Sequence, residues 1–292
     1  MSKADKNYTI DDLQYLMQRL REPKYGCSWD LAQNYQSIAA STIEEMYEVI
    51  DAIEQNNLDQ LKDELGDLLF QIIFYSQLGK EDKAFTFDDI TTAITQKLLR
   101  RHPHVFPDGT LESKSSGLEA DRELAQASIK KTWEKIKQQE RLSKGQKGIM
   151  ADVPRALPAT IRAVKLQKRA ASVGFDWPNT DGVYKKIDEE INEVITAVNY
   201  LDGLKAANEK VTDEALSSAN THVAEEIGDL LFSVINLARH LKVAPETALR
   251  HANNKFEQRF HSLEQTADKH QTTIEVQSSA TLEAWWQAAK NQ

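Results

Sequence analysis

The chain has 292 residues and a formal net charge of −9, from 36 basic and 45 acidic side chains. Such an acidic chain is unlike a protein that binds nucleic acids directly, which would present a basic face. A single cysteine, Cys27, excludes an internal disulfide framework and a zinc site built on cysteines. The 11 glycines and 7 prolines are about half of the usual share of roughly 12%, which favours long helices over many short strands.

The first residues and the hydropathy of the chain predict its location. Residues 1–6 are polar and do not resemble a signal peptide. No apolar run approaches the ~20 residues that a helix needs to span a bilayer. We therefore expect a soluble, cytoplasmic protein that does not associate with membranes.

In the first half, apolar residues recur at the spacing of amphipathic helices. The pattern predicts helices over residues 11–21, 61–78 and 87–99, and a further one that begins at a Ser41 or Thr42 cap. The helix over 61–78 is apolar nearly all round, so we expect it to be buried on most sides.

The second half shows the same pattern, and neither half contains a convincing run of alternating residues typical of strands. We predict that the fold class is all-α throughout. The helices predicted for this half cover residues 159–172, 183–200, 223–241 and 245–260.

Two stretches of the first half recur in the second. Residues 63–70, Asp-Glu-Leu-Gly-Asp-Leu-Leu-Phe, return at 225–232 as Glu-Glu-Ile-Gly-Asp-Leu-Leu-Phe, and residues 43–50 return at 188–195. A period this long indicates tandem domains and not a solenoid. The segment between the copies is polar and contains Gly and Pro, which is typical of a linker. The predicted organisation is a domain over 1–140, a linker over 141–158 and a domain over 159–292.

The repeated stretches contain pairs of acidic residues three positions apart, which share one face of a helix. The second pair of each copy enters a very apolar helix, where a carboxylate is costly unless it is paired or binds a metal. Facing pairs would repel each other, and a hard divalent cation such as Mg²⁺ would relieve that repulsion. The pairs are Glu45 with Glu48 and Glu64 with Asp67, then Glu190 with Glu193 and Glu226 with Asp229.

Other interpretations of the acidic pairs remain. A single pair on a helix is usually a solvated face. A di-iron helical bundle would need histidine three residues after glutamate, where this chain has Asp67 and Asp229. The all-oxygen set therefore favours Mg²⁺, with Mn²⁺ also possible, over iron or zinc.

Basic and aromatic residues follow the acidic pairs in both copies. Their spacing of four puts the basic pairs on one helix face, where they could hold phosphate oxygens or complement the helix dipole. These pairs are Lys97 with Arg101 and Lys255 with Arg259. Trp133 and Trp286 could stack on a nucleobase or serve as packing anchors. Lys186 lies four residues before Glu190 and would point toward the carboxylates, whereas the first copy has Ser41 there.

With these motifs, the chain resembles the MazG family over nearly its whole length. The resemblance rests on the pattern E-E-x-x-E followed by E-x-x-D, as Glu44 to Asp67 and again as Glu189 to Asp229. The segments Gly26-Cys-Ser-Trp-Asp30, Arg100-Arg-His-Pro-His-Val-Phe106 and Val173-Gly-Phe-Asp-Trp177 support it.

The resemblance implies an all-α protein whose helical units dimerise, either as paired domains or as paired subunits. It also implies Mg²⁺-dependent hydrolysis of nucleoside triphosphates to monophosphate and pyrophosphate. By match to the family motif, the metal ligands are Glu190, Glu193, Glu226 and Asp229, or Glu45, Glu48, Glu64 and Asp67. The nucleotide contacts implied in the same way are Lys186, Lys255, Arg259 and Trp286, or Lys97, Arg101 and Trp133.

The two copies differ in spacing. Between Glu193 and Glu226 lie 32 residues, against 15 between Glu48 and Glu64. If the extra residues, roughly 201–220, only extend a loop, the second site survives; a shift of the helix register would disrupt it. Because only the second copy has Lys186, we expect it to be the working site and keep the first as a candidate.

In the chemistry that we expect, a glutamate of the first pair orients or deprotonates the attacking water. The candidates for this catalytic role are Glu190, Glu193, Glu45 and Glu48. A narrower all-α hydrolase, for example one acting on dUTP, is an alternative. A helical interaction protein without catalysis is another.

Overall fold

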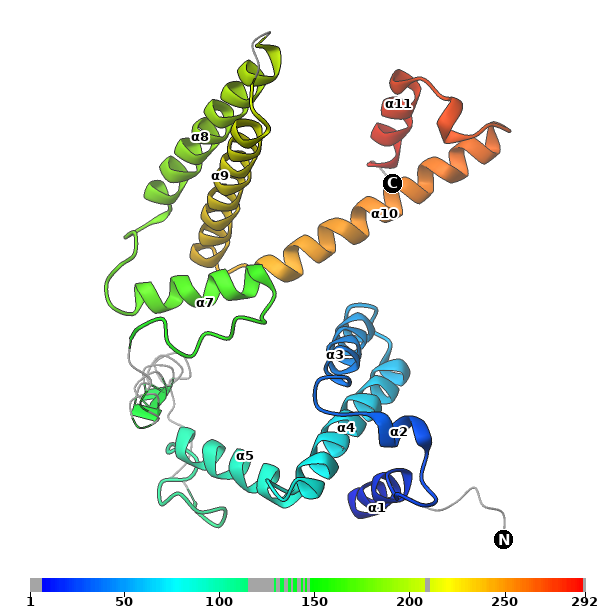
Figure 1. Cartoon of the computed structure of the whole chain (residues 1–292), viewed down its shortest axis with the longest axis vertical. Coiled ribbons are helices and arrows are strands. Elements are labelled where there is room, and N and C mark those ends of the chain that lie inside the picture. The colour runs from blue at the N-terminus through cyan, green and yellow to red at the C-terminus, as the bar shows by residue number, and fades with distance from the viewer. Residues whose placement is uncertain are drawn as a thin grey trace. The chain divides into compact units, whose positions relative to one another are not determined.

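The computed structural model describes residues 7–114, 148–207 and 211–290, together with a few single residues between 129 and 145. Over these residues the chain is helical and contains no strand, which confirms the predicted all-α class (Figure 1). The chain divides into two compact units, residues 1–140 and 141–292. None of the described helices is both long and apolar enough to cross a membrane.

The first unit is built around a helical hairpin. Helices α3 and α4 pack against each other, α1 packs on α4, and α5 follows after a short turn. The core lies between α1 and α4 and includes Met17, Ile38, Ile73, Phe74 and Leu78. The helices are α1 (Ile10–Leu20), α2 (Ser28–Ala32), α3 (Ala39–Glu54), α4 (Leu58–Glu81) and α5 (Phe87–Arg101).

The prediction that α3 begins at a Ser41 or Thr42 cap is wrong. The helix begins at Ala39, its N-cap residue is Ile38, and no side chain caps it. Ile38 is a buried core residue, so packing of this side chain fixes the start of the helix. The Thr42 hydroxyl instead donates to the Ile38 carbonyl oxygen at 3.0 Å. By contrast, threonine capping boxes begin α1 and α5, as local sequence favours.

The second unit repeats the hairpin in its helices α8 and α9, and α7 packs on α9. Helix α10 starts beside α7 and leaves the hairpin, and α11 folds back onto α10 (Figure 1). The elements are α7 (Ala159–Ala171), α8 (Thr180–Ala206), α9 (Asp213–His240), α10 (Pro245–Lys269), the 3-10 helix η1 (Ile274–Val276) and α11 (Ser279–Ala289).

The extra residues of the second copy lengthen both arms of its hairpin equally. Thirteen residues separate Glu193 from the end of α8, and thirteen separate the start of α9 from Glu226. The matching distances in the first hairpin are six residues on each arm. Each arm therefore gains seven residues, and seven residues are close to two full helical turns. Leu201 and Ala219 are buried within the added length, so the insertion is packed helix and keeps the register of the acidic pairs.

An arginine–carboxylate pair ties each hairpin to its preceding segment. Arg21, just after α1, holds Glu81 at the end of α4 through Nε–Oε1 and Nη2–Oε2 contacts of 3.0 and 2.8 Å. In the second unit, Arg239 on α9 binds Asp176, which precedes α8, through Nη1–Oδ2 at 3.0 Å and Nη2–Oδ1 at 2.5 Å. Both guanidinium groups bind both carboxylate oxygens, a geometry that fixes orientation as well as charge.

Candidate functional site

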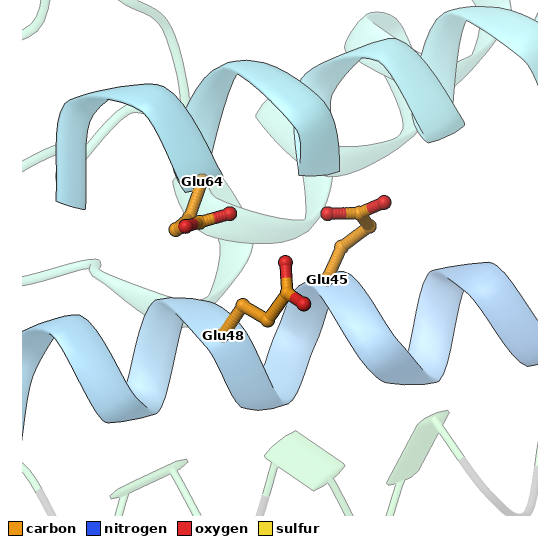
Figure 2. A group of neighbouring side chains, drawn as sticks. All are labelled: Glu45, Glu48 and Glu64. Atoms are coloured by element: carbon orange, nitrogen blue, oxygen red, sulfur yellow. The ribbon is translucent and has the colours of Figure 1, made fainter. Parts of the chain in front are cut away.

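The first hairpin brings three glutamates together. Glu45 and Glu48 share one face of α3 and reach toward Glu64 on α4 (Figure 2). One carboxylate oxygen from each of the three lies within 4.8 Å of the others. Three of the four carboxylates of the predicted pairs therefore meet, because antiparallel packing sets the α3 face against α4.

The close approach of these carboxylates raises two of their pKa values. Burial raises the pKa of Glu45, and repulsion from Asp67 and Glu64 raises it further. The pKa of Glu48 is raised chiefly by a hydrogen bond shared with Glu64, and also by desolvation and repulsion. Asp67 lies outside the tight group of three but close enough to act on Glu45. Such repulsion is what a bound divalent cation relieves.

The second hairpin forms a cluster from Glu190 on α8 and from Glu226 and Asp229 on α9, with oxygens again within 4.8 Å. Here the aspartate of the second pair is a member, in place of the second glutamate of the first pair. The Glu190 side chain is only 5% exposed, and its Oε2 atom is buried without a hydrogen-bond partner. A buried carboxylate oxygen without a partner is costly. Together with two further carboxylates, it fits the oxygen ligands that Mg²⁺ or Mn²⁺ takes.

Glu193 lies beside this cluster but is 47% exposed. Desolvation and a hydrogen bond with Glu190 raise its pKa, and repulsion from Glu190 and Glu226 adds to this. Lys186 opposes these effects, since its positive charge favours the ionised form. Glu193 is thus the more accessible carboxylate of its pair.

Lys186 reaches into the second cluster, as its spacing predicts. Its Nζ atom lies 2.9 Å from Glu190 Oε1, 2.7 Å from Glu189 Oε1 and 4.0 Å from Glu193 Oε2. These carboxylates raise the pKa of the lysine, with the hydrogen bonds to Glu189 and Glu190 the largest causes. The lysine is therefore firmly charged in the absence of metal.

The chain matches the sequence model of the MazG nucleotide pyrophosphohydrolase domain twice, over residues 33–106 and 180–263. Both matches contain a complete set of acidic pairs and the basic pair that follows. The chain belongs to the MazG family.

Three similar proteins match this chain over nearly its full length. The nucleoside triphosphate pyrophosphohydrolase of Escherichia coli K12 is 44% identical over 283 residues, which cover 97% of each chain. The nucleoside triphosphate pyrophosphohydrolase/pyrophosphatase MazG of Thermotoga maritima is 38% identical over 96% of this chain and 95% of its own. The protein YabN of Bacillus subtilis is 34% identical over 94% of this chain and half of its own length.

The basic pairs of the two MazG segments differ in what they bind. In the first, Arg101 Nη2 contacts Glu140 Oε2 at 2.5 Å, and Arg100 lies 3.6 Å from the other oxygen of that carboxylate. The hydrogen bond from Arg101 holds the pKa of Glu140 below its usual value. In the second, Lys255 and Arg259 on α10 have no ion-pair partner within the described residues. The second pair is therefore free to bind an anion.

Within one chain, the free basic pair does not lie beside the acidic cluster of the α8–α9 hairpin. Helix α10 packs on α7, α9, η1 and α11, and it extends away from the α8–α9 hairpin (Figure 1). Lys255 and Arg259 lie ten and fourteen residues into α10, about 15 and 21 Å along it. The predicted grouping of these residues with the acidic cluster is therefore not formed within the second unit alone.

Both predicted stacking tryptophans have packing partners and lie outside the MazG segments. Trp133 meets the ring of His102 edge-on with centroids 5.0 Å apart, and Lys137 Nζ lies 5.9 Å from the indole centroid. Trp286 packs on Phe256 at 5.2 Å, next to Lys255 in sequence. Each tryptophan therefore has an aromatic packing contact, and that of Trp286 lies beside the free basic pair.

A polar side chain that was not predicted contacts one glutamate of each cluster. His222 Nδ1 lies 3.4 Å from Glu226 Oε1, and Gln60 Nε2 donates to Glu64 Oε1 at 3.3 Å. Both residues precede their glutamate by four positions, so they stand at the same place in the two copies. That spacing, applied to the second acidic pair as it was to Lys186, would have revealed them.

Proposed function

We propose that this protein hydrolyses nucleoside triphosphates to nucleoside monophosphates and pyrophosphate, with the α8–α9 cluster as the working site. Membership of the MazG family and the relatives named as nucleoside triphosphate pyrophosphohydrolases support the activity. The observation that carries the choice of site is Glu190, a buried carboxylate with an unpartnered oxygen among two further carboxylates. A site of this kind needs a cation.

Glu190, Glu226 and Asp229, with Glu193 beside them, are the residues that would hold Mg²⁺ or Mn²⁺. When bound, the ion supplies charge neutralisation for the phosphate oxygens and acidifies water. Glu193 is the carboxylate that we assign to accept the proton of the attacking water, because it lies beside the cluster and is 47% exposed, so that it can reach a water molecule. The water oxygen bonds to the α-phosphorus, and the bond to the bridging oxygen of the pyrophosphate leaving group breaks.

The phosphates also need positive side chains, and Lys255 and Arg259 are the free pair. Because α10 carries them away from the carboxylates of their own chain, we assign them to the site of a second copy. Apolar side chains support pairing of hairpins between two copies, since Ile191, Ile195 and Leu231 on α8 and α9 are 41%, 52% and 58% exposed. Such a face is typical of a helix pair that completes a bundle.

The tandem organisation is part of the same proposal. Residues 1–140 and 159–292 form two MazG domains, and 141–158 link them. The α3–α4 domain would have a lesser role in turnover, because Glu140 holds Arg101 there and Ser41 stands in place of Lys186. In this division, the first domain contributes its apolar hairpin face to assembly.

The test separates the two clusters and identifies the bond that breaks. Glu193→Gln should reduce Mg²⁺-dependent release of pyrophosphate by about 10²-fold or more, as expected for loss of a general base, while Glu48→Gln should leave most of it. Chromatography of the products from each of several nucleoside triphosphates provides the measurement and separates a broad enzyme from a dUTP-selective one. Full activity of a chain that carries both Glu193→Gln and Glu48→Gln, or diphosphate and phosphate as products, would contradict the proposal.

A further inference from the structure

The second cluster contains its own cation. Lys186 Nζ contacts Glu190 and Glu189 and lies at the limit of ion-pair distance from Glu193. The lysine side chain is 32% exposed, whereas Glu190 is 5% exposed, so the ammonium group reaches a buried carboxylate from the solvent side. One positive charge nevertheless leaves Glu190 Oε2 without a partner.

Among the described residues, no such cation contacts the first cluster. Ser41 stands four residues before Glu45, where Lys186 stands before Glu190. Within the part of the chain that the structure describes, no basic side chain lies within ion-pair distance of Glu45, Glu48 or Glu64. The two clusters therefore share their ligand chemistry but differ in compensation of charge.

We propose that Lys186 is the internal counter-ion of the second cluster, which it neutralises in the metal-free protein and leaves when a divalent cation binds Glu190. This inference rests on the proposed metal site. An ammonium group at 2.9 Å from Glu190 Oε1 and a divalent cation bound by the same carboxylate would repel each other strongly. The four-carbon stem of lysine allows Nζ to turn outward without any change of the backbone.

The exchange has a consequence for the substrate. The displaced ammonium group is left at the solvent edge of the cluster, where substrate phosphates complete the coordination of Mg²⁺. Cation binding thus delivers a free positive charge to the place where a triphosphate enters. Metal and nucleotide binding should reinforce each other in the second copy, and less so in the first.

The experiment uses the full chain with Glu45→Gln and Glu48→Gln, so that Mg²⁺ titrated by calorimetry reports on the second cluster. Adding Lys186→Met should strengthen Mg²⁺ binding about tenfold, within the range of coupling between contacting charged groups. The same variant should melt at a lower temperature without metal and show a larger upward shift with Mg²⁺. Lys185→Met is the matched control, and it should change neither quantity.

The reciprocal variant tests the idea even if Lys186→Met folds poorly. In a chain with Glu190→Gln and Glu193→Gln, Ser41→Lys should weaken Mg²⁺ binding at the first cluster about tenfold and raise the metal-free melting temperature. Unchanged or weaker Mg²⁺ binding in Lys186→Met, or no effect of Ser41→Lys, would contradict the role of Lys186 as a counter-ion and leave the proposed metal site standing. Absence of Mg²⁺ binding in the parent and in every variant overturns the proposed metal site as well.

Discussion

The α3–α4 and α8–α9 hairpins present nearly the same carboxylates at the same helical positions, and yet their surroundings differ in two ways. Lys186 contacts the second cluster, whereas no basic side chain of the described residues forms an ion pair with the first, where Gln60 donates to Glu64. The basic pair after the first hairpin is held by Glu140, whereas the pair after the second is free among the described residues. A duplicated ligand set thus does not imply a duplicated activity, because the charges around it decide what can bind.

The largest expected effect comes from the register of the longer hairpin. Deleting seven residues from each arm, 200–206 and 213–219, should keep the acidic pairs opposed and preserve pyrophosphate release. Deleting only 217–219 should rotate the first turn of α9 by about 60° relative to Glu226 and Asp229. The packing of the arm on α8 then competes with the opposition of the acidic pairs, at a cost of up to about 10²-fold in kcat/KM, as expected for a displaced catalytic group. Steady-state kinetics measures both, and circular dichroism controls for helix content. Equal activity of the two deletions would refute the importance of the register.

A mixing experiment tests whether two copies share a site. Glu226→Gln and Lys255→Met chains should each be nearly inactive alone. After unfolding and refolding together at equal amounts, half of the dimers would contain both chains and each would have one intact site, giving about one quarter of the wild-type activity for a two-fold dimer. If the mixture stays as inactive as its parts, the basic residues act within their own chain.

Release of Arg101 from Glu140 should make the anion binding of the first copy more like that of the second. In a chain with Glu190→Gln and Glu226→Gln, Glu140→Gln removes the charge that holds Arg101 and should strengthen binding of inorganic pyrophosphate about threefold or more. Calorimetry gives the dissociation constant. Glu112→Gln, an exposed change on the loop after α5, is the control. Equal affinities in both variants would show that the Arg101 contact does not limit anion binding.

The smallest effect concerns stability at low pH. The hydrogen bonds from Arg21 lower the pKa of Glu81 and outweigh the opposing effect of burial. Because the folded-state pKa is below the ordinary value of 4.5, this stabilisation is complete above pH 4.5 and is lost as the pH falls through the folded value. Between pH 6 and pH 3, the melting temperature of Arg21→Met should therefore fall less steeply with decreasing pH than that of the wild type. Parallel curves would mean that the pair contributes no pH dependence.

Much of the site follows from spacing alone. The periodicity of three places Glu45 with Glu48, and the two share a cluster in the structure. The periodicity of four places Lys186 over Glu190, which it contacts at 2.9 Å. The apolar run after Glu64 predicts a helix that is buried on most sides. The helix is there as α4, but the burial is wrong for its first half, because the buried residues lie from Gln71 onward and Leu65 is 48% exposed. The shared faces and the presence of the helix depend only on the geometry of one helix, so the sequence suffices to predict them.

Features that depend on contacts between elements could not be predicted in this way. A buried Ile38 fixes the start of α3 in place of the expected Ser41 or Thr42 cap. The inserted residues near 201–220 extend packed helices, where sequence left a choice between a loop and a shifted register. The ion pair between Arg101 and Glu140 joins residues 39 positions apart, and no local sequence pattern indicates it.

The sequence by itself determined the all-α class, the duplication and the acidic faces, because helical periodicity and repeated motifs are local properties. Only the tertiary structure decided which oxygens meet within 4.8 Å, which carboxylate is buried, and which basic residues are already bound. Those outcomes depend on how the arms of each hairpin pack, and packing is set by side chains that are distant in the chain. The difference in charge between the two clusters is the property on which the proposed division of labour depends.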